Sequence, residues 1–143
     1  MKSKWRAIFL VLVVGIAVTL AILTYATQKD RFESDLVNTA QHNSTLVLEP
    51  AGDVEWTHGF VVCPYMPLSD IPQEFRSLFS DSKLLDDGSQ WIVFATAQGP
   101  TVEELSRSAV DFCTDNSGQT FEPGQTWAVH TKADEATKFT LQH

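Results

Sequence analysis

The chain has 143 residues, which suffices for one domain of ordinary size and one appended segment. Its net charge of −8 is unevenly distributed: Lys2, Lys4 and Arg6 precede a long uncharged run, and after residue 27 there are 7 basic against 18 acidic side chains. So acidic a surface repels phosphate backbones, which excludes nucleic acid as a partner. With 43% hydrophobic residues and 9 Phe, the sequence is too apolar for a disordered acidic tail, so the acidic part should fold.

Residues 7–26 form an almost unbroken apolar run of 20 residues. As a helix this run would be about 30 Å long, the thickness of the hydrocarbon core of a bilayer. Trp5 and Tyr25 flank it where aromatic rings favour the membrane interface, and the basic residues at 2, 4 and 6 favour a cytoplasmic amino terminus. We therefore predict that residues 1–27 anchor the chain in the plasma membrane as a single pass. The carboxyl-terminal domain would then be extracytoplasmic.

A cleaved signal peptide is the alternative interpretation of this segment. Thr24-Tyr25-Ala26 is an acceptable cleavage site, but the apolar core of a signal peptide usually has about 7–15 residues. The length of the run therefore favours an uncleaved anchor.

Residues 28–43 are polar but keep a helical rhythm, and we expect them to form a helical stalk. Phe32, Leu36 and Ala40 recur every four residues, and no Pro or Gly interrupts the segment. Because an isolated helix this short is marginal in water, its apolar stripe should pack on another surface. That surface is either the chain's own domain or another subunit.

Residues 44–143 are expected to form one extracytoplasmic α+β domain. Apolar alternation, uncharged runs and flanking turn residues predict five strands, at Ser44–Leu48, Val54–Cys63, Gln90–Ala97, Gln125–Thr131 and Thr137–Gln142. In the second strand one face should carry the residues Val54, Trp56, His58, Phe60 and Val62.

Two helices are predicted between these strands. Ser69-Asp70 should cap the first, which has Pro72 in its first turn and directs Ile71, Phe75, Leu78 and Phe79 inward. Thr101 and Glu104 have the form of a capping box at the start of the second, over Thr101–Thr114. The element order is then ββαβαββ, with the helices on one face of a mainly antiparallel sheet.

Cys63 and Cys113 are the only cysteines, and both fall in the part predicted to be exported, where disulfides persist. Cys63 ends a core-directed strand and Cys113 lies on the inner stripe of the predicted last helix, so we predict a disulfide between them. One alternative is a pair of buried free thiols. Another is a reactive thiol, because Cys63-Pro64-Tyr65-Met66 resembles the Cys-Pro-Tyr-Cys of glutaredoxins. Met66 replaces the second cysteine, however, and no basic residue lies nearby to lower the pKa of the thiol.

No arrangement of catalytic or metal-binding residues can be recognised. The histidines, among them His58 and His130, lack zinc-ligand spacing, and there is no Gly-rich phosphate loop or nucleophile elbow. The adjacent acids Asp86-Asp87, Glu103-Glu104 and Asp134-Glu135 fall in predicted turns or a first helical turn, where solvation is expected. We therefore predict that the protein is not an enzyme and uses no metal and no cofactor.

The layout of the whole chain resembles that of the single-pass accessory subunits of actinobacterial cytochrome bcc–aa3 respiratory supercomplexes. The shared features are the cationic terminus at 2–6, the span at 7–26, and an acidic domain with Cys63-Pro64-Tyr65 and Cys113. This resemblance implies a non-catalytic chain that packs its membrane helix and outer domain against larger membrane-protein subunits. It assigns no functional residue in this sequence.

We therefore expect a non-catalytic, single-pass accessory or interaction subunit of a membrane complex. The predicted contacts are the stripe on the stalk and the exposed faces of three domain residues: Phe32, Leu36, Ala40, Tyr65, Met66 and Phe121. The alternative is an exported module that binds a small ligand or cell-wall component in a pocket lined by Trp56, Phe60, Trp91 and Trp127. A thiol enzyme built on Cys63 is the third hypothesis.

Overall fold

The computed structural model describes residues 31–114 and 117–142. The chain divides into two compact units, Met1–Arg31 and Phe32–His143, and the second is a small α+β domain with two sheets and few helices. The predicted membrane span over residues 7–26 lies outside the described residues. Among those described, no helix combines the length and the apolar character needed to cross a membrane.

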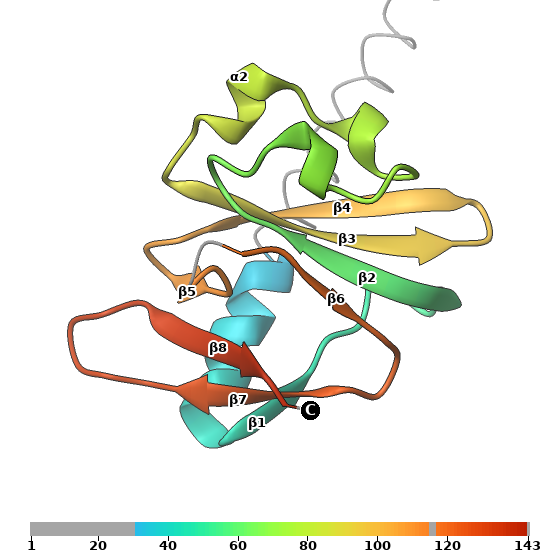
Figure 1. Cartoon of the computed structure of the whole chain (residues 1–143). Coiled ribbons are helices and arrows are strands. Elements are labelled where there is room, and N and C mark those ends of the chain that lie inside the picture. The colour runs from blue at the N-terminus through green and yellow to red at the C-terminus, as the bar shows by residue number, and fades with distance from the viewer. Residues whose placement is uncertain (1–30, 115–116, 143) are drawn as a thin grey trace, which may run out of the picture. The chain divides into compact units, whose positions relative to one another are not determined.

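The first sheet, here called the β3 sheet, has the strand order β4-β3-β2-β6 and is antiparallel throughout (Figure 1). Its strands are β2 (Trp56–Val62), β3 (Ser89–Thr96), β4 (Gly99–Ser106) and β6 (Gln119–Phe121). β2 and β3 are paired on both edges, as their uncharged, aromatic and β-branched sequences favour. The two strands predicted over Val54–Cys63 and Gln90–Ala97 are thus confirmed.

The second sheet, the β7 sheet, has the strand order β1-β7-β8-β5. Its strands are β1 (Thr45–Val47), β7 (Thr126–His130), β8 (Thr137–Leu141) and β5 (Val110–Asp111). β5 pairs with β8 in parallel, whereas the other described pairs of this sheet are antiparallel. The strand at Ser44–Leu48 and the hairpin of the last two strands were predicted and are confirmed.

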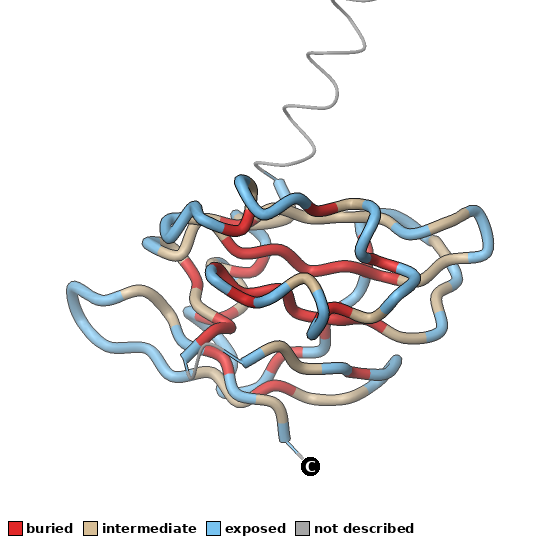
Figure 2. Tube along the Cα trace, turned by 45° about the horizontal axis from the view of Figure 1, so that its top comes forward, coloured by how far each residue is buried: buried red, intermediate tan, exposed pale blue. Residues whose placement is uncertain are grey.

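An aromatic core lies between the two sheets. The Phe121 ring of β6 contacts Phe94 of β3 with centroids 5.7 Å apart and Trp127 of β7 with centroids 5.6 Å apart. Phe112, just after β5, stacks on Phe139 of β8 at 4.3 Å. Figure 2 shows that the buried residues concentrate along the middle of the strands. These contacts join the sheets into one hydrophobic core.

The other face of the β3 sheet is covered by residues 64–88 (Figure 1). Phe79 meets Trp91 of β3 edge to face at 5.7 Å, and Phe75 lies 5.6 Å from the His58 ring of β2. Both faces of this sheet are therefore buried, which explains why β3 is almost entirely apolar.

A bulge in β2 corrects the predicted row of inward residues. The pairing with β3 shifts register between Trp56 and His58. As a result, Trp56 contacts Phe94 and belongs to the core between the sheets, whereas His58 contacts Phe75 on the opposite face. The predicted single face was wrong because one extra residue reverses the alternation of a strand.

The helix predicted over Thr101–Thr114 is absent, and its first part is strand β4. A two-residue turn follows β3, and Gly99 takes a φ of +115°, so the chain reverses and pairs along all eight residues of β3. Pro100 is tolerated because β4 is an edge strand of the described sheet. The capping box was a local signal, and pairing with β3 overrode it.

The helix predicted from Ser69 is replaced by short turns: η1 (Leu68–Asp70), η2 (Arg76–Leu78) and α2 (Asp81–Leu84). The Arg76 guanidinium donates hydrogen bonds of 2.8 Å to the carbonyl oxygens of Ile71 and Ser69, which an α-helix would have used internally. The predicted inward residues Ile71, Phe75 and Phe79 are nevertheless buried, and Leu78 is partly buried.

Residues 31–42 are helical, and their apolar stripe packs on the chain's own domain. Leu36 and Ala40 are buried in the core, and the Phe32 ring meets Phe94 of β3 at 6.5 Å. A Glu33 carboxylate oxygen accepts a 2.6 Å hydrogen bond from the Ser106 backbone N–H at the end of β4. Of the two surfaces considered for this stripe, the domain itself is the one observed.

Glu103 of β4 supplies a pH-dependent prediction, because burial raises the pKa of its carboxyl. The folded state then holds the proton more tightly than the unfolded chain, so stability is lost as pH rises through the ordinary glutamate range and up to the raised pKa. Glu103→Gln should therefore raise the melting temperature at pH 7, and the gain should disappear near pH 3. Thermal melts of the wild-type protein and the variant between pH 3 and pH 7 measure this difference in melting temperature. The exposed control Glu55→Gln should show no such pattern; an equal gain at both pH values would contradict the prediction.

Candidate interaction site around Tyr65

The predicted disulfide between Cys63 and Cys113 is present, with Cα atoms 5.7 Å apart. It links the residue after β2 to a segment that follows β5, so the supposed helix was not needed to bring the cysteines together. Both residues are fully buried, and no cysteine of the chain is free. The hypotheses of buried free thiols and of a reactive Cys63 thiol are therefore wrong.

Tyr65, two residues after the bridge, is held in an unusual and exposed conformation. Its φ is +62°, a region that costs a non-glycine residue about 1–2 kcal/mol. Its backbone N–H donates a 2.7 Å hydrogen bond to the carbonyl oxygen of Leu84 in α2, and prolines stand at 64 and 67. The side chain is 61% exposed although it is large and aromatic. The surrounding structure thus fixes a strained backbone that holds the ring in solvent.

Leu85 lies beside this segment because the Tyr65 N–H is hydrogen-bonded to Leu84, the residue that precedes Leu85. Leu84 is buried, and Ser80 caps α2 by accepting a hydrogen bond from the Lys83 backbone N–H, so α2 is firmly seated. Leu85 follows at the end of α2 with 64% of its surface exposed. Three large hydrophobic residues are exposed among the residues described, Val47, Tyr65 and Leu85, and the last two lie on the two segments that this hydrogen bond joins. We call Tyr65 and Leu85 together the Tyr65–Leu85 patch.

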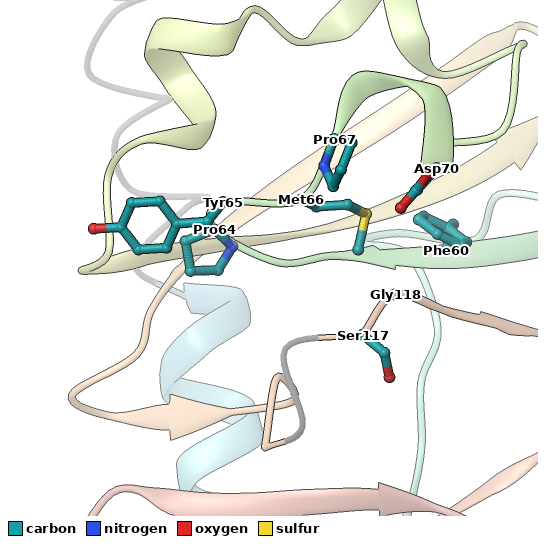
Figure 3. Close-up of a pocket in the computed structure, with 8 residues that line it drawn as sticks. All are labelled: Phe60, Pro64, Tyr65, Met66, Pro67, Asp70, Ser117 and Gly118. Atoms are coloured by element: carbon teal, nitrogen blue, oxygen red, sulfur yellow. The ribbon is translucent and has the colours of Figure 1, made fainter.

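Next to the patch the same segment forms one wall of a pocket of about 390 Å³ (Figure 3). Pro64, Met66, Pro67 and Asp70 line this wall, and Ser117 and Gly118 line the opposite one. Phe60 of β2 also lines the pocket, and Figure 3 shows the Asp70 carboxylate turned towards Phe60 and Met66, with the Tyr65 ring pointing away. We call this cavity the Asp70 pocket.

Gly118 allows the two walls to approach closely. A Cβ atom there would lie 2.4 Å from Phe60 Cζ and 2.5 Å from Met66 Cε. The disulfide joins the same two chain segments, and Cys63 Sγ lies 3.6 Å from the Ser117 carbonyl oxygen. The shape of the Asp70 pocket therefore depends on contacts between residues more than 50 positions apart.

The predicted interaction residues differ in how far the structure exposes them. Of the six, Tyr65 alone is exposed, whereas Leu36, Ala40, Met66 and Phe121 are buried and Phe32 is partly buried. The predicted exposed faces of Met66 and Phe121 were wrong. Met66 is covered where Gly118 and Phe60 approach it, and Phe121 lies over Gly59. Leu85 and Asp70 were missed, although the Asp86-Asp87-Gly88 turn after Leu85 indicated a surface position.

The aromatic lining proposed for a ligand pocket does not form. Trp91 and Trp127 are fully buried in different sheets, and Phe60 and Trp56 line separate cavities. The second cavity, of about 470 Å³, lies beside Trp56, Thr57 and Thr96. Trp56 and Trp127 both contact Phe121 between the sheets, whereas Trp91 contacts Phe79 on the other face of the β3 sheet, so these rings share no pocket.

The histidines are likewise apart. His58 of the β3 sheet lies with Nε2 3.0 Å from a Glu74 carboxylate oxygen, and His130 of the β7 sheet lies with Nε2 2.7 Å from the Thr140 hydroxyl. A backbone hydrogen bond and then the contact with His58 lower the pKa of Glu74. In the part of the chain that the structure describes, no three His, Cys, Asp or Glu side chains are grouped as metal ligands would be.

Comparison with protein-family models, curated proteins and solved structures finds no match.

Proposed function

We propose that the protein is a non-catalytic, membrane-anchored accessory subunit whose outer domain binds a larger membrane-protein subunit through the Tyr65–Leu85 patch. The apolar run at 7–26 supports the anchor, and the resemblance in layout to supercomplex accessory subunits supports the class of partner. The observation that carries the proposal is the exposed Tyr65 ring on a strained backbone that a hydrogen bond ties to Leu84. Large aromatic side chains held in advance in one conformation are typical energetic centres of interfaces.

The charge around the patch indicates the charge that the surface of the partner should carry. Leu85 is flanked in sequence by exposed Asp81, Asp86 and Asp87, so an apolar centre is bordered by negative charge. A partner with an apolar depression and a basic rim would match this arrangement, and opposite charges at the rim would favour fast and correctly oriented association.

Co-purification of the full chain at native expression in gentle detergent tests the proposal. We expect a partner at fixed stoichiometry, and Tyr65→Ala combined with Leu85→Ala should weaken its binding about 10- to 30-fold. Val47→Ala, which truncates the other exposed hydrophobic residue, is the matched control and should retain the partner. Recovery of the chain alone, or equal recovery of a partner by the double variant, would refute the proposal.

Tyr65→Gly separates binding from folding, because glycine adopts a φ of +62° without the steric cost. We expect this variant to lose the partner while its melting temperature stays unchanged or rises. A fall in melting temperature would instead show that the Tyr65 ring stabilises the fold.

A second candidate function, an exported module that binds a small ligand, is favoured by the Asp70 pocket alone. Its volume lies within the range of small-ligand sites, and one carboxylate stands among apolar walls. Binding of free ligands in the absence of any partner would support it.

A further inference from the structure

We infer that the Asp70 pocket receives a basic side chain, Lys or Arg, from the partner subunit; this rests on the proposed function and specifies its chemistry. Among the described residues that line the pocket, Asp70 alone carries a carboxylate. Its carboxylate accepts a 3.0 Å hydrogen bond from the Ser69 hydroxyl, and no cation of the described residues forms a salt bridge with it. The nearby Arg76 is engaged by the carbonyl oxygens of Ile71 and Ser69. The charge of Asp70 thus lacks a counter-charge within the described domain.

The other walls suit the stem of a long basic side chain. Met66, Pro64 and Pro67 provide apolar surface for methylene groups, and the Phe60 ring lies near the carboxylate (Figure 3). Lys and Arg bury their stems along such surfaces while the charged end reaches a polar group. An aromatic face near the same end adds a cation–π attraction. A neutral or acidic side chain would form neither the ion pair with Asp70 nor the cation–π contact with Phe60.

The overall charge and the disulfide favour the same occupant. The excess of acidic side chains in the domain attracts a basic segment before contact and repels an acidic one. The Cys63–Cys113 bridge restrains the two chain segments that carry the walls, which lowers the conformational entropy lost on binding. The pocket also adjoins the Tyr65–Leu85 patch through Tyr65, so one partner surface can occupy both.

The two methionines of the chain provide a direct measurement. Met66 lines the pocket and Met1 is the first residue, so a chain labelled with ¹³C at the methionine methyl groups gives one signal that reports the pocket. We would titrate the full chain in non-ionic detergent with Nα-acetylarginine amide. The uncharged analogue Nα-acetylcitrulline amide, which has nearly the same shape, is the matched control ligand.

We expect the arginine derivative to shift the Met66 signal in a saturable way at millimolar concentration, and the citrulline derivative to shift it far less. Asp70→Asn should weaken binding about fivefold, whereas Asp87→Asn, which removes an equal charge outside the pocket, should leave it unchanged. Asp70 is exposed, so the fold should tolerate this change, and an unaltered melting temperature checks it. Equal shifts with both ligands, no shift, or unchanged binding by the Asp70→Asn variant would overturn the inference.

The same variant in the co-purification experiment separates this inference from the proposed function. Loss of the partner from Tyr65→Ala/Leu85→Ala but not from Asp70→Asn would overturn the pocket inference and leave the proposed function intact. If co-purification recovers the chain alone while the isolated chain still binds the arginine derivative, the proposed function is refuted and a site for small organic cations is supported.

Discussion

Breaking the Cys63–Cys113 bridge should lower the free energy of unfolding of the domain by about 4 kcal/mol. The two cysteines are 50 positions apart, so the bridge closes a long loop and restricts the unfolded chain strongly. For a domain of this size we expect the melting temperature to fall by about 15 °C or more. Thermal melts of the full chain with and without reductant measure the difference. Cys63→Ala combined with Cys113→Ala should behave like the reduced protein.

Intact-mass analysis provides the control for this experiment. The denatured, unreduced chain should take up no alkylating reagent, and the reduced chain should take up two adducts. Restoring the bridge by removing the reductant should restore the melting temperature. Equal melting temperatures for the oxidised and reduced chains would contradict the stabilising role. Because both walls of the Asp70 pocket follow bridged cysteines, reduction should also abolish the Met66 response to the arginine derivative.

Replacing Gly59 with alanine should destabilise the domain by about 3 kcal/mol or more. A Cβ atom at this position would lie 2.2 Å from Phe121 Cζ, because the Phe121 ring covers the glycine directly. The ring has no room to retreat, since Trp56, Phe94 and Trp127 contact it with centroids 5.6–5.7 Å away. Chemical denaturation with tryptophan fluorescence measures the loss.

Two further variants show whether steric overlap is the cause. Gly88→Ala adds the same methyl group in an exposed turn, where the nearest atom would be 3.3 Å away, and should cost much less. Phe121→Leu should relieve the overlap, so the double variant with Gly59→Ala should lose less stability than the sum of the two single changes. A wild-type free energy of unfolding for Gly59→Ala, or strict additivity in the double variant, would contradict this account.

The strands whose patterns are local could be predicted from the sequence. β3 has an uncharged run of aromatic and β-branched residues, and the β7–β8 hairpin has two such runs around a short polar turn. β4 was assigned to a helix because Thr101 and Glu104 mimic a capping box and the next apolar residues follow helical spacing. Residues 99–106 instead pair with β3, and this partner cannot be identified from the β4 sequence.

The candidate site was only partly predicted, again because it depends on contacts between segments distant in the chain. Tyr65 was predicted to have an exposed face, and its exposure agrees with that prediction. Leu85 and Asp70 were not chosen, because neither has a sequence signal that connects it with Tyr65. The hydrogen bond from Tyr65 to the carbonyl oxygen of Leu84 and the approach of Gly118 to Phe60 create the patch and the pocket.

Four properties of the domain could be predicted from the amino-acid sequence: its acidic character, its α+β class, the pairing of its two cysteines and most of its strands. Each depends on composition, on the number of residues of one type or on a short repeating pattern of neighbouring residues. Three others follow from the folded chain: β4 is a strand, Trp56 and His58 face opposite sides of the β3 sheet, and Leu36 and Met66 are buried. These outcomes depend on backbone pairing and steric contact between segments distant in the chain, and the free energy of such contacts exceeds local preference.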